Sequence, residues 1–134
     1  MKRNNKITLL IAMLVLAVLM SCPITGCGGS DSPADVVNQS LKAYNDRDFN
    51  KVYDLSSSKL QDMSESREKV TELMETSWPP GATMVDIEVT DEKIDGDHAE
   101  VTWKGTLTMP EIPDQQAGAT VNLIREDDVW KIDL

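Results

Sequence analysis

The chain has 134 residues and a formal net charge of −10, from 23 acidic and 13 basic side chains. Nucleic-acid binding depends on clustered Lys and Arg that neutralise phosphates, so this acidic excess excludes a nucleic-acid partner. The length leaves room for one folded domain behind an N-terminal targeting segment, and for no second core.

The first twenty residues have the layout of a secretory signal. Residues 1–6 carry Lys2, Arg3 and Lys6 and no acid, and residues 7–20 are uncharged and, apart from Thr8, apolar. That apolar run is shorter than the roughly 20 residues that a membrane-spanning helix needs. An uncleaved membrane anchor stays open as an alternative, because no charge follows until Asp31.

The segment Ile24-Thr25-Gly26-Cys27 resembles a bacterial lipobox. The resemblance implies that a diacylglyceryl group is attached to the thiol of Cys27 and that a peptidase cuts before it. A rival box ends at Cys22, but it has the large Met20 where a small residue is preferred, and Pro23 follows it. We therefore expect Cys27 to be the lipid-attachment residue.

Other roles for the two cysteines fit the sequence less well. A Cys22–Cys27 disulfide would close a small loop and would lose Cys22 on cleavage. Two cysteines and one distant histidine are too few ligands for a metal site, and the flexible GGSDS segment that follows Cys27 would not hold a catalytic thiol in place. We divide the chain into a signal peptide at 1–26, a lipidated Cys27 with a tether at 27–32, and a folded domain at 33–134. Cleavage removes three basic residues and no acid, so the formal charge becomes −13.

The first half of this domain has helical signals. Ser32 and Pro33, with Asp35 behind them, predict a helix start, and Val37, Leu41 and Tyr44 recur at helical spacing. A second, short helix is expected around Phe49–Tyr53. A third is expected from about Ser64 to the break at Trp78-Pro79-Pro80-Gly81, with its apolar face turned inward; that face carries Val70, Leu73 and Met74.

The second half alternates with a period of two residues, which predicts strands. Asp95-Gly96 predicts a hairpin turn, residues 109–116 a longer loop with two prolines, and Glu126-Asp127-Asp128 a final turn. The strand residues that we expect to face the helices are all apolar: Val85, Ile87, Val89, Val101, Trp103, Val121, Leu123, Trp130 and Ile132.

Helices followed by a meander of strands predict an α+β fold, with N-terminal helices packed on a curved antiparallel sheet of about four strands. Several stretches resemble an uncharacterised family of bacterial lipoproteins and, through it, the nuclear transport factor two-like superfamily of cone-shaped α+β proteins, which includes ketosteroid isomerase. These stretches are Asp35-Val36-Val37, Leu41-Lys42-Ala43-Tyr44, Arg47-Asp48-Phe49, Tyr53-Asp54-Leu55-Ser56 and residues 121–133. One departure is Asp128, where the family usually has glycine, which speaks against a tight primed turn there.

Enzymes of this superfamily carry an ionisable group on the inner wall of the cone. Simple alternation places no carboxylate there, so we expect no catalytic residue, no cofactor and no metal site. A rival isomerase- or lyase-like enzyme would need a bulge that turns Asp86 or Glu88 inward. His98 is expected at the exposed start of a strand, and Asp95-Gly96-Asp97 is interpreted as a turn because further calcium ligands are missing.

The two tyrosines and three tryptophans serve either as core or as the wall of a pocket. We expect most to be core, and name Tyr44, Trp78 and Trp103 as candidates for a shallow apolar ligand site. The expected partners are the membrane, through the lipid anchor, and a small apolar ligand or an envelope protein. The expected location is the bacterial cell envelope, either the outer side of the cytoplasmic membrane or the outer membrane.

Overall fold

The computed structural model describes residues 31–134. The signal peptide, Cys22 and Cys27 therefore lie outside the described residues. The elements are, in chain order, α2 (Pro33–Asn45), α3 (Phe49–Asp54), α4 (Ser58–Asp62), α5 (Arg67–Ser77), β1 (Thr83–Asp95), β2 (His98–Met109), β3 (Ile112–Glu126) and β4 (Val129–Asp133). No helix among these residues is long and apolar enough to cross a membrane.

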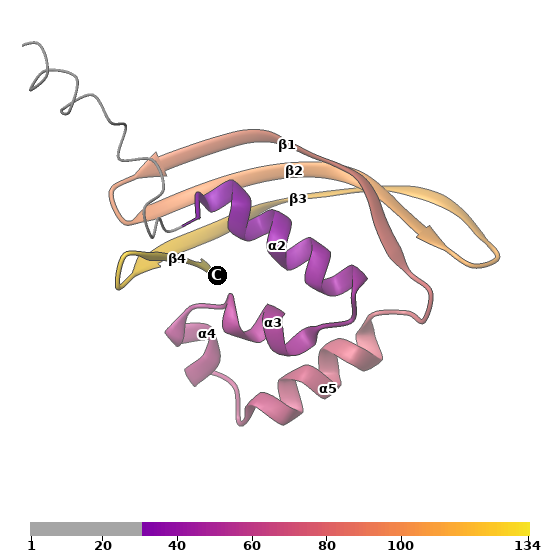
Figure 1. Ribbon diagram of the computed structural model, residues 1–134, viewed down its shortest axis with the longest axis horizontal. Coiled ribbons are helices and arrows are strands. Elements are labelled where there is room, and N and C mark those ends of the chain that lie inside the picture. The colour runs from indigo at the N-terminus through magenta and orange to yellow at the C-terminus, as the bar shows by residue number, and fades with distance from the viewer. Residues whose placement is uncertain (1–30) are drawn as a thin grey trace, which may run out of the picture.

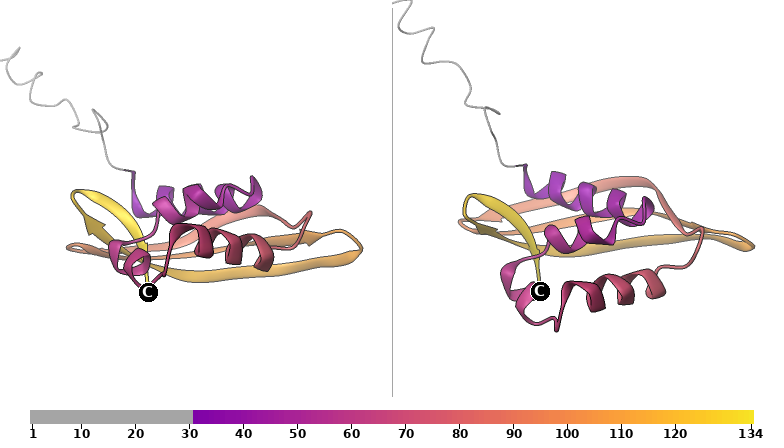
Figure 2. Two further views of the ribbon diagram at one scale, coloured as in Figure 1. Left: turned by 90° about the horizontal axis from the view of Figure 1, so that it is seen from below. Right: turned by 60° about the horizontal axis from the view of Figure 1, so that its bottom comes forward.

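The four strands form one antiparallel sheet in the order β1-β2-β3-β4. The sheet arches over the helices (Figure 1), and the β2–β3 hairpin extends past them in both views of Figure 2. The predicted α+β class with helices on a curved antiparallel sheet is thus confirmed.

Helix α2 begins where its local signals predict. The Ser32 side chain accepts a hydrogen bond from the backbone N–H of Asp35, and the Asp35 carboxylate accepts one from the N–H of Ser32, which is a complete capping box. At its other end, the amide of Asn45 bonds to both backbone groups of Met84, at 2.7 and 2.8 Å. These two bonds fix the last turn of α2, and Tyr44 with it, to the start of β1.

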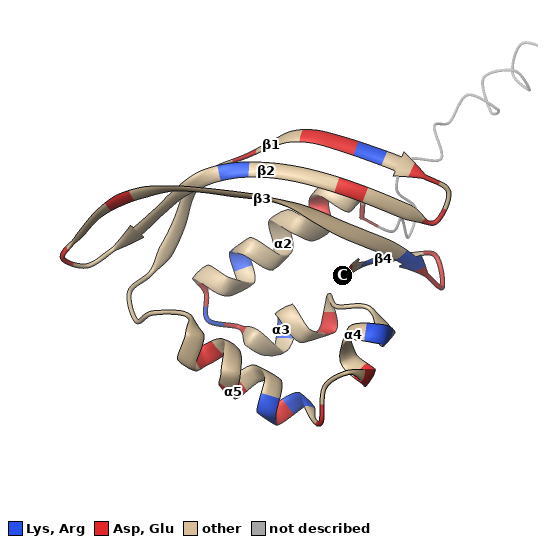
Figure 3. Cartoon of the chain, turned by 180° about the vertical axis from the view of Figure 1, so that it is seen from behind, with Lys and Arg blue, Asp and Glu red and all other residues tan. Residues whose placement is uncertain are grey.

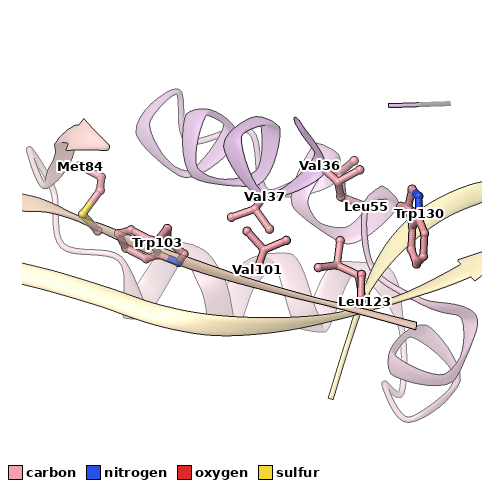
Figure 4. Close-up of a cluster of buried hydrophobic side chains, with 9 residues drawn as sticks. Val36, Val37, Leu55, Met84, Val101, Trp103, Leu123 and Trp130 are labelled. Carbon is pink, nitrogen blue, oxygen red and sulfur yellow. The ribbon is translucent and has the colours of Figure 1, made fainter. Parts of the chain in front are cut away.

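The core lies between α2 and the sheet (Figure 4). Val37, Val101 and Leu123 are almost completely buried there, and Trp103 and Trp130 lie towards its two ends. Deleting a buried aliphatic side chain of this kind costs about 2–5 kcal/mol of stability. The predicted inward residues of β2, β3 and β4 all belong to this cluster or pack against it.

The predicted register of β1 is wrong at its start. Val85 pairs with Thr106 on the outer face and is 36% exposed, while Met84 takes the inward place and is buried. The cause is a pair of register shifts, one between Val85 and Glu88 and one between Val89 and Asp91, because each extra residue reverses which side chains face the core. Gly105 lies opposite the first shift, where a Cβ would approach the Val85 carbonyl to 3.0 Å.

The expected loop at 109–116 is also wrong. Strand β2 continues to Met109, a turn at Pro110 and Glu111 follows, and β3 begins at Ile112. Glu111 takes a left-handed φ of 64° in this turn. Pro113 lies at a register shift between β2 and β3, between the Leu107 and Met109 pairs, where a missing N–H is tolerated.

The last turn forms despite Asp128. Asp127 and Asp128 have φ of 49° and 64°, so two aspartates adopt the left-handed geometry that favours glycine. The Asp95-Gly96 turn is confirmed, with Gly96 at a φ of 60°, and His98 is exposed at the start of β2 as predicted.

The third predicted helix differs in start and in burial. It begins at Arg67 with Ser66 as its cap, and a separate short helix, α4, which the sequence analysis missed, precedes it. No residue of α5 is buried, and Leu73 is 66% exposed. The predicted inward face is therefore wrong for Leu73, whereas Val70 and Met74 are half-buried, and α5 packs on α3 rather than on the sheet.

Candidate functional site

A largely apolar cavity of about 330 Å³ lies between the sheet and the helices. We call it the Tyr44 cavity, after the residue that stands at its junction with a second hollow. Its lining comes from three strands and four helices and contains Val37, Ser40, Leu41, Tyr44, Val52, Ser56, Leu60, Met74, Trp103, Ala119, Val121 and Ile132. Its volume is at the lower end of the range for small-molecule sites.

The second hollow, the Trp78 cavity, has a volume of about 390 Å³ and is lined by Tyr44, Leu73, Met74, Ser77 and Trp78. Tyr44 and Met74 belong to both walls. The three aromatic residues predicted as candidates are thus divided between two adjoining cavities: Trp103 lines the first, Trp78 the second, and Tyr44 both.

Tyr44 is held in place by its neighbours. Its ring centre lies 5.3 Å from that of Trp78 and 5.9 Å from that of Phe49, the latter in an edge-to-face contact. Burial raises the pKa of the Tyr44 phenol. The hydroxyl therefore stays protonated at neutral pH and is available as a hydrogen-bond donor.

Arg47 fixes the wall on the side of α5. It has a left-handed φ of 56°, and its guanidinium donates to the carbonyl oxygens of Glu75 and Trp78, both at 3.2 Å. The same group lies over the Phe49 ring at 5.5 Å. Among the described residues, the buried Nε1 of Trp78 has no hydrogen-bond acceptor.

The chemistry available in the Tyr44 cavity is narrow. Its side-chain hydroxyls are those of Ser40, Tyr44 and Ser56, and Ser56 already donates to the Val52 carbonyl at 3.1 Å. No lining residue carries a formal charge at neutral pH. A general base must lie within hydrogen-bond reach of the proton that it removes, and this wall provides none in an ionised form.

The bulges of β1 do turn a carboxylate toward the helices, but a different one from those considered in the sequence. Asp86 and Glu88 are exposed, and Glu88 forms an ion pair with Lys104 at 2.9 Å. Glu92 lies opposite the inward Val101 and accepts a hydrogen bond from the backbone N–H of Ala34 at 2.8 Å. It therefore binds the N-terminus of α2 and is absent from the lining of both cavities.

A larger cavity, of about 470 Å³, lies near the turn between β1 and β2. Lys93, Glu100, Asn122 and Asp133 line it and form one row across the sheet. Because charged and mostly exposed side chains surround it, we regard the smaller Tyr44 cavity as the better candidate site. Within residues 31–134, no group of three potential metal ligands comes together.

Comparisons with known proteins support this architecture. No family model matches the chain, and no curated protein matches it. Among solved structures, it is similar to a SEC-C motif-containing protein from Rhodopseudomonas palustris, with a TM-score of 0.62 and 14% identity over 77% of this chain and 76% of that one.

Two further similar structures are described by name as NTF2-like. A protein described as an NTF2-like transpeptidase from Campylobacter jejuni has a TM-score of 0.54 and 17% identity, covering 78% of this chain and 99% of that one. An NTF2-like protein of unknown function from Shewanella oneidensis has a TM-score of 0.55 and 12% identity, covering 74% and 89%. The fold is NTF2-like. It is the nuclear transport factor two-like cone that the sequence resemblance predicted, and its function is a separate question.

Proposed function

We propose that this NTF2-like chain is a membrane-anchored bacterial lipoprotein whose folded domain binds apolar groups in the Tyr44 cavity and catalyses no reaction. The observation that carries the binding role is the cavity wall, which combines aliphatic and aromatic side chains with the hydroxyl-bearing residues Tyr44 and Ser40. Sites of this composition bind through apolar contact and orient the ligand with few polar groups.

The rival enzymatic role needs a carboxylate inside the cone. Asp86 and Glu88, the residues on which it depended, are exposed. Glu92 is engaged at the start of α2. The geometry therefore favours binding over acid–base catalysis.

The membrane part of the proposal rests on the sequence. A basic start, an apolar run and a lipobox that ends at Cys27 occur in the order that lipoprotein export requires. Two or three acyl chains on one N-terminal cysteine would anchor the domain stably, whereas one chain gives marginal binding. The anchor would place the domain in the cell envelope, on the outer side of the cytoplasmic membrane or on the outer membrane.

Mass spectrometry of the mature N-terminus tests the anchor. We expect the first residue to be a diacylated Cys27. A mature chain that begins at Cys22, or one that retains an unmodified Met1, would contradict the assignment.

A titration with small alcohols tests the cavity. The full chain is placed in lipid nanodiscs, and empty nanodiscs serve as the blank. Addition of 1-hexanol should change the tryptophan fluorescence saturably, because Trp103 lines the cavity. Hexanoate should bind more weakly, since its charge would be buried without a partner.

Three variants locate the binding site. Ser40→Leu fills the cavity from α2 and should lower the hexanol affinity at least about tenfold, whereas Ser40→Ala removes the same hydroxyl without filling and should change it little. Ala119→Leu fills the cavity from β3. It provides a second cavity-filling variant in case Ser40→Leu does not fold. Equal hexanol binding by all three variants would refute the proposed site.

A further inference from the structure

One edge of β3 is free over most of its length. Strand β4 pairs with β3 only from Asn122 to Glu126. Residues 112–121 therefore have no strand beside them on that side among the described residues, and Figure 1 shows β3 running far beyond the short β4.

The hydrogen bonds of β4 show which backbone groups point to this edge. Ile132 donates to the Leu55 carbonyl at 2.8 Å and accepts from the N–H of Ser57 at 2.7 Å, so both of its backbone groups point away from β3. Its neighbours Lys131 and Asp133 must then bond to Ile124 and Asn122, with which they pair.

The same alternation continues along β3 into its unpaired part. Gln116, Gly118 and Thr120 therefore direct their N–H and C=O groups to the free edge. Arg125 is one of the alternate residues whose backbone groups should point to β2 instead. Its N–H donates to the Asp97 carbonyl on the β2 side at 2.7 Å, as this alternation requires.

This edge lacks the usual protection against pairing. Native edge strands are blocked by charges, prolines or covering elements. Pro113 and Asp114 stand only at the beginning of β3, and the stretch from Gln115 to Val121 has neither charge nor proline. Helix α5 packs on α3 and leaves this edge uncovered.

The free edge adjoins the Tyr44 cavity. Ala119 and Val121, which point inward, line that cavity together with Leu60 of α4 and Met74 of α5. Side chains of a strand alternate between its two faces, so a strand added at the edge would direct every second side chain toward this apolar wall.

We propose that the free edge of β3 binds an extended segment of another polypeptide by strand addition, with large apolar side chains at alternate positions of that segment entering the Tyr44 cavity. This inference rests on the proposed binding role of the cavity and adds the class of partner. The backbone groups of Gln116, Gly118 and Thr120 supply the hydrogen bonds, and the cavity selects the side chains.

The chemistry of the partner segment follows from the size of the side chains that would enter the cavity and from the net charge of this chain. A second copy of this chain would bring the small Ala117 and Ala119 to the cavity, and two cleaved copies, acidic as the sequence makes them, repel one another. A segment with basic residues between its apolar ones would be attracted instead. We therefore assign the edge to a basic, alternating segment of a different protein.

A synthetic peptide tests the proposal. A capped peptide in which leucine alternates with lysine and threonine is titrated into the full chain in zwitterionic nanodiscs, beside a peptide of the same composition with adjacent leucines. Thr120→Pro removes one edge N–H, and Thr120→Ala removes the same side-chain hydroxyl while it keeps that N–H. We expect the alternating peptide to bind, and the proline variant to bind it at least about tenfold more weakly than the alanine variant.

The outcomes separate this inference from the cavity itself. Retained hexanol binding together with equal peptide affinity in the two Thr120 variants would overturn strand addition and leave the cavity proposal standing. Equal binding of both peptides, or peptide binding unaffected by Ser40→Leu, would overturn the role of alternate side chains. Peptide binding only to dimers in sedimentation experiments would assign the edge to a second copy and overturn the choice of partner.

Discussion

At the scale of single residues, Ser57 and Asp133 join the helical half to the end of the sheet. Ser57 is fully buried, and its hydroxyl donates to an Asp133 carboxylate oxygen at 2.6 Å. The Asp133 side chain is 13% exposed. This hydrogen bond, followed by the backbone amide of Leu134 and the charges of Lys59 and His98, lowers the pKa of Asp133 despite partial burial.

The lowered pKa predicts a dependence of stability on pH. A carboxyl whose pKa falls on folding contributes stability above its unfolded pKa of about 3.9 and loses that contribution as pH falls through the lower folded value. Asp133→Asn should therefore destabilise the domain at pH 7 and make little difference well below pH 4. Denaturant unfolding at several pH values measures this difference.

Asp128→Asn is the matched control, because that carboxylate lies exposed in the last turn and asparagine tolerates its left-handed φ. We expect its effect on stability to stay small at every pH. A deficit of the Asp133→Asn variant that persists unchanged at low pH would contradict the role given to the charge.

Residues of the candidate site stand out in the sequence only where their residue type is rare. Tyr44, Trp78 and Trp103 stood out in the sequence because the chain has few aromatic residues, and all three line one or both of the adjoining cavities. Ser40 and Ala119 gave no such signal, because a small residue marks a cavity wall only after the opposite walls are known. Glu92 was missed because its inward position depends on the second register shift of β1.

At the scale of elements, local signals were sufficient for the start of α2, whereas alternation was not sufficient for the register of β1. The start of α2 depends on Ser32, Pro33 and Asp35, which are adjacent in sequence. The register of β1 depends on where β2 accepts an extra residue, and alternation alone does not specify this. Val85 therefore faced the wrong way in the prediction.

For helix α5 too, the sequence pattern did not predict the tertiary packing. Its apolar residues recur at the spacing of a buried face, yet α5 packs on α3 and leaves Leu73 exposed beside the Trp78 cavity. Periodicity identifies which residues share a face of a helix, but the partner of that face is decided by tertiary packing. Two residues of this face, Leu73 and Met74, line the Trp78 cavity.

At the scale of the whole molecule, α2 and the sheet enclose the core and α5 stands apart from the sheet (Figures 1 and 4). Acidic side chains are spread over strands and helices rather than gathered in one patch (Figure 3), which suits a solvated domain. The function proposed here therefore depends on the interior of the cone and on the free edge of β3.

Methyl NMR of the full chain in nanodiscs during a 1-hexanol titration tests this central claim most directly. Met74, Leu41 and Val121 line the Tyr44 cavity, whereas Val85 lies on the outer face of the sheet. We predict saturable shift changes at the methyl groups of the three cavity residues and none at those of Val85. Changes confined to the outer face, or equal changes at all four residues, would contradict the account.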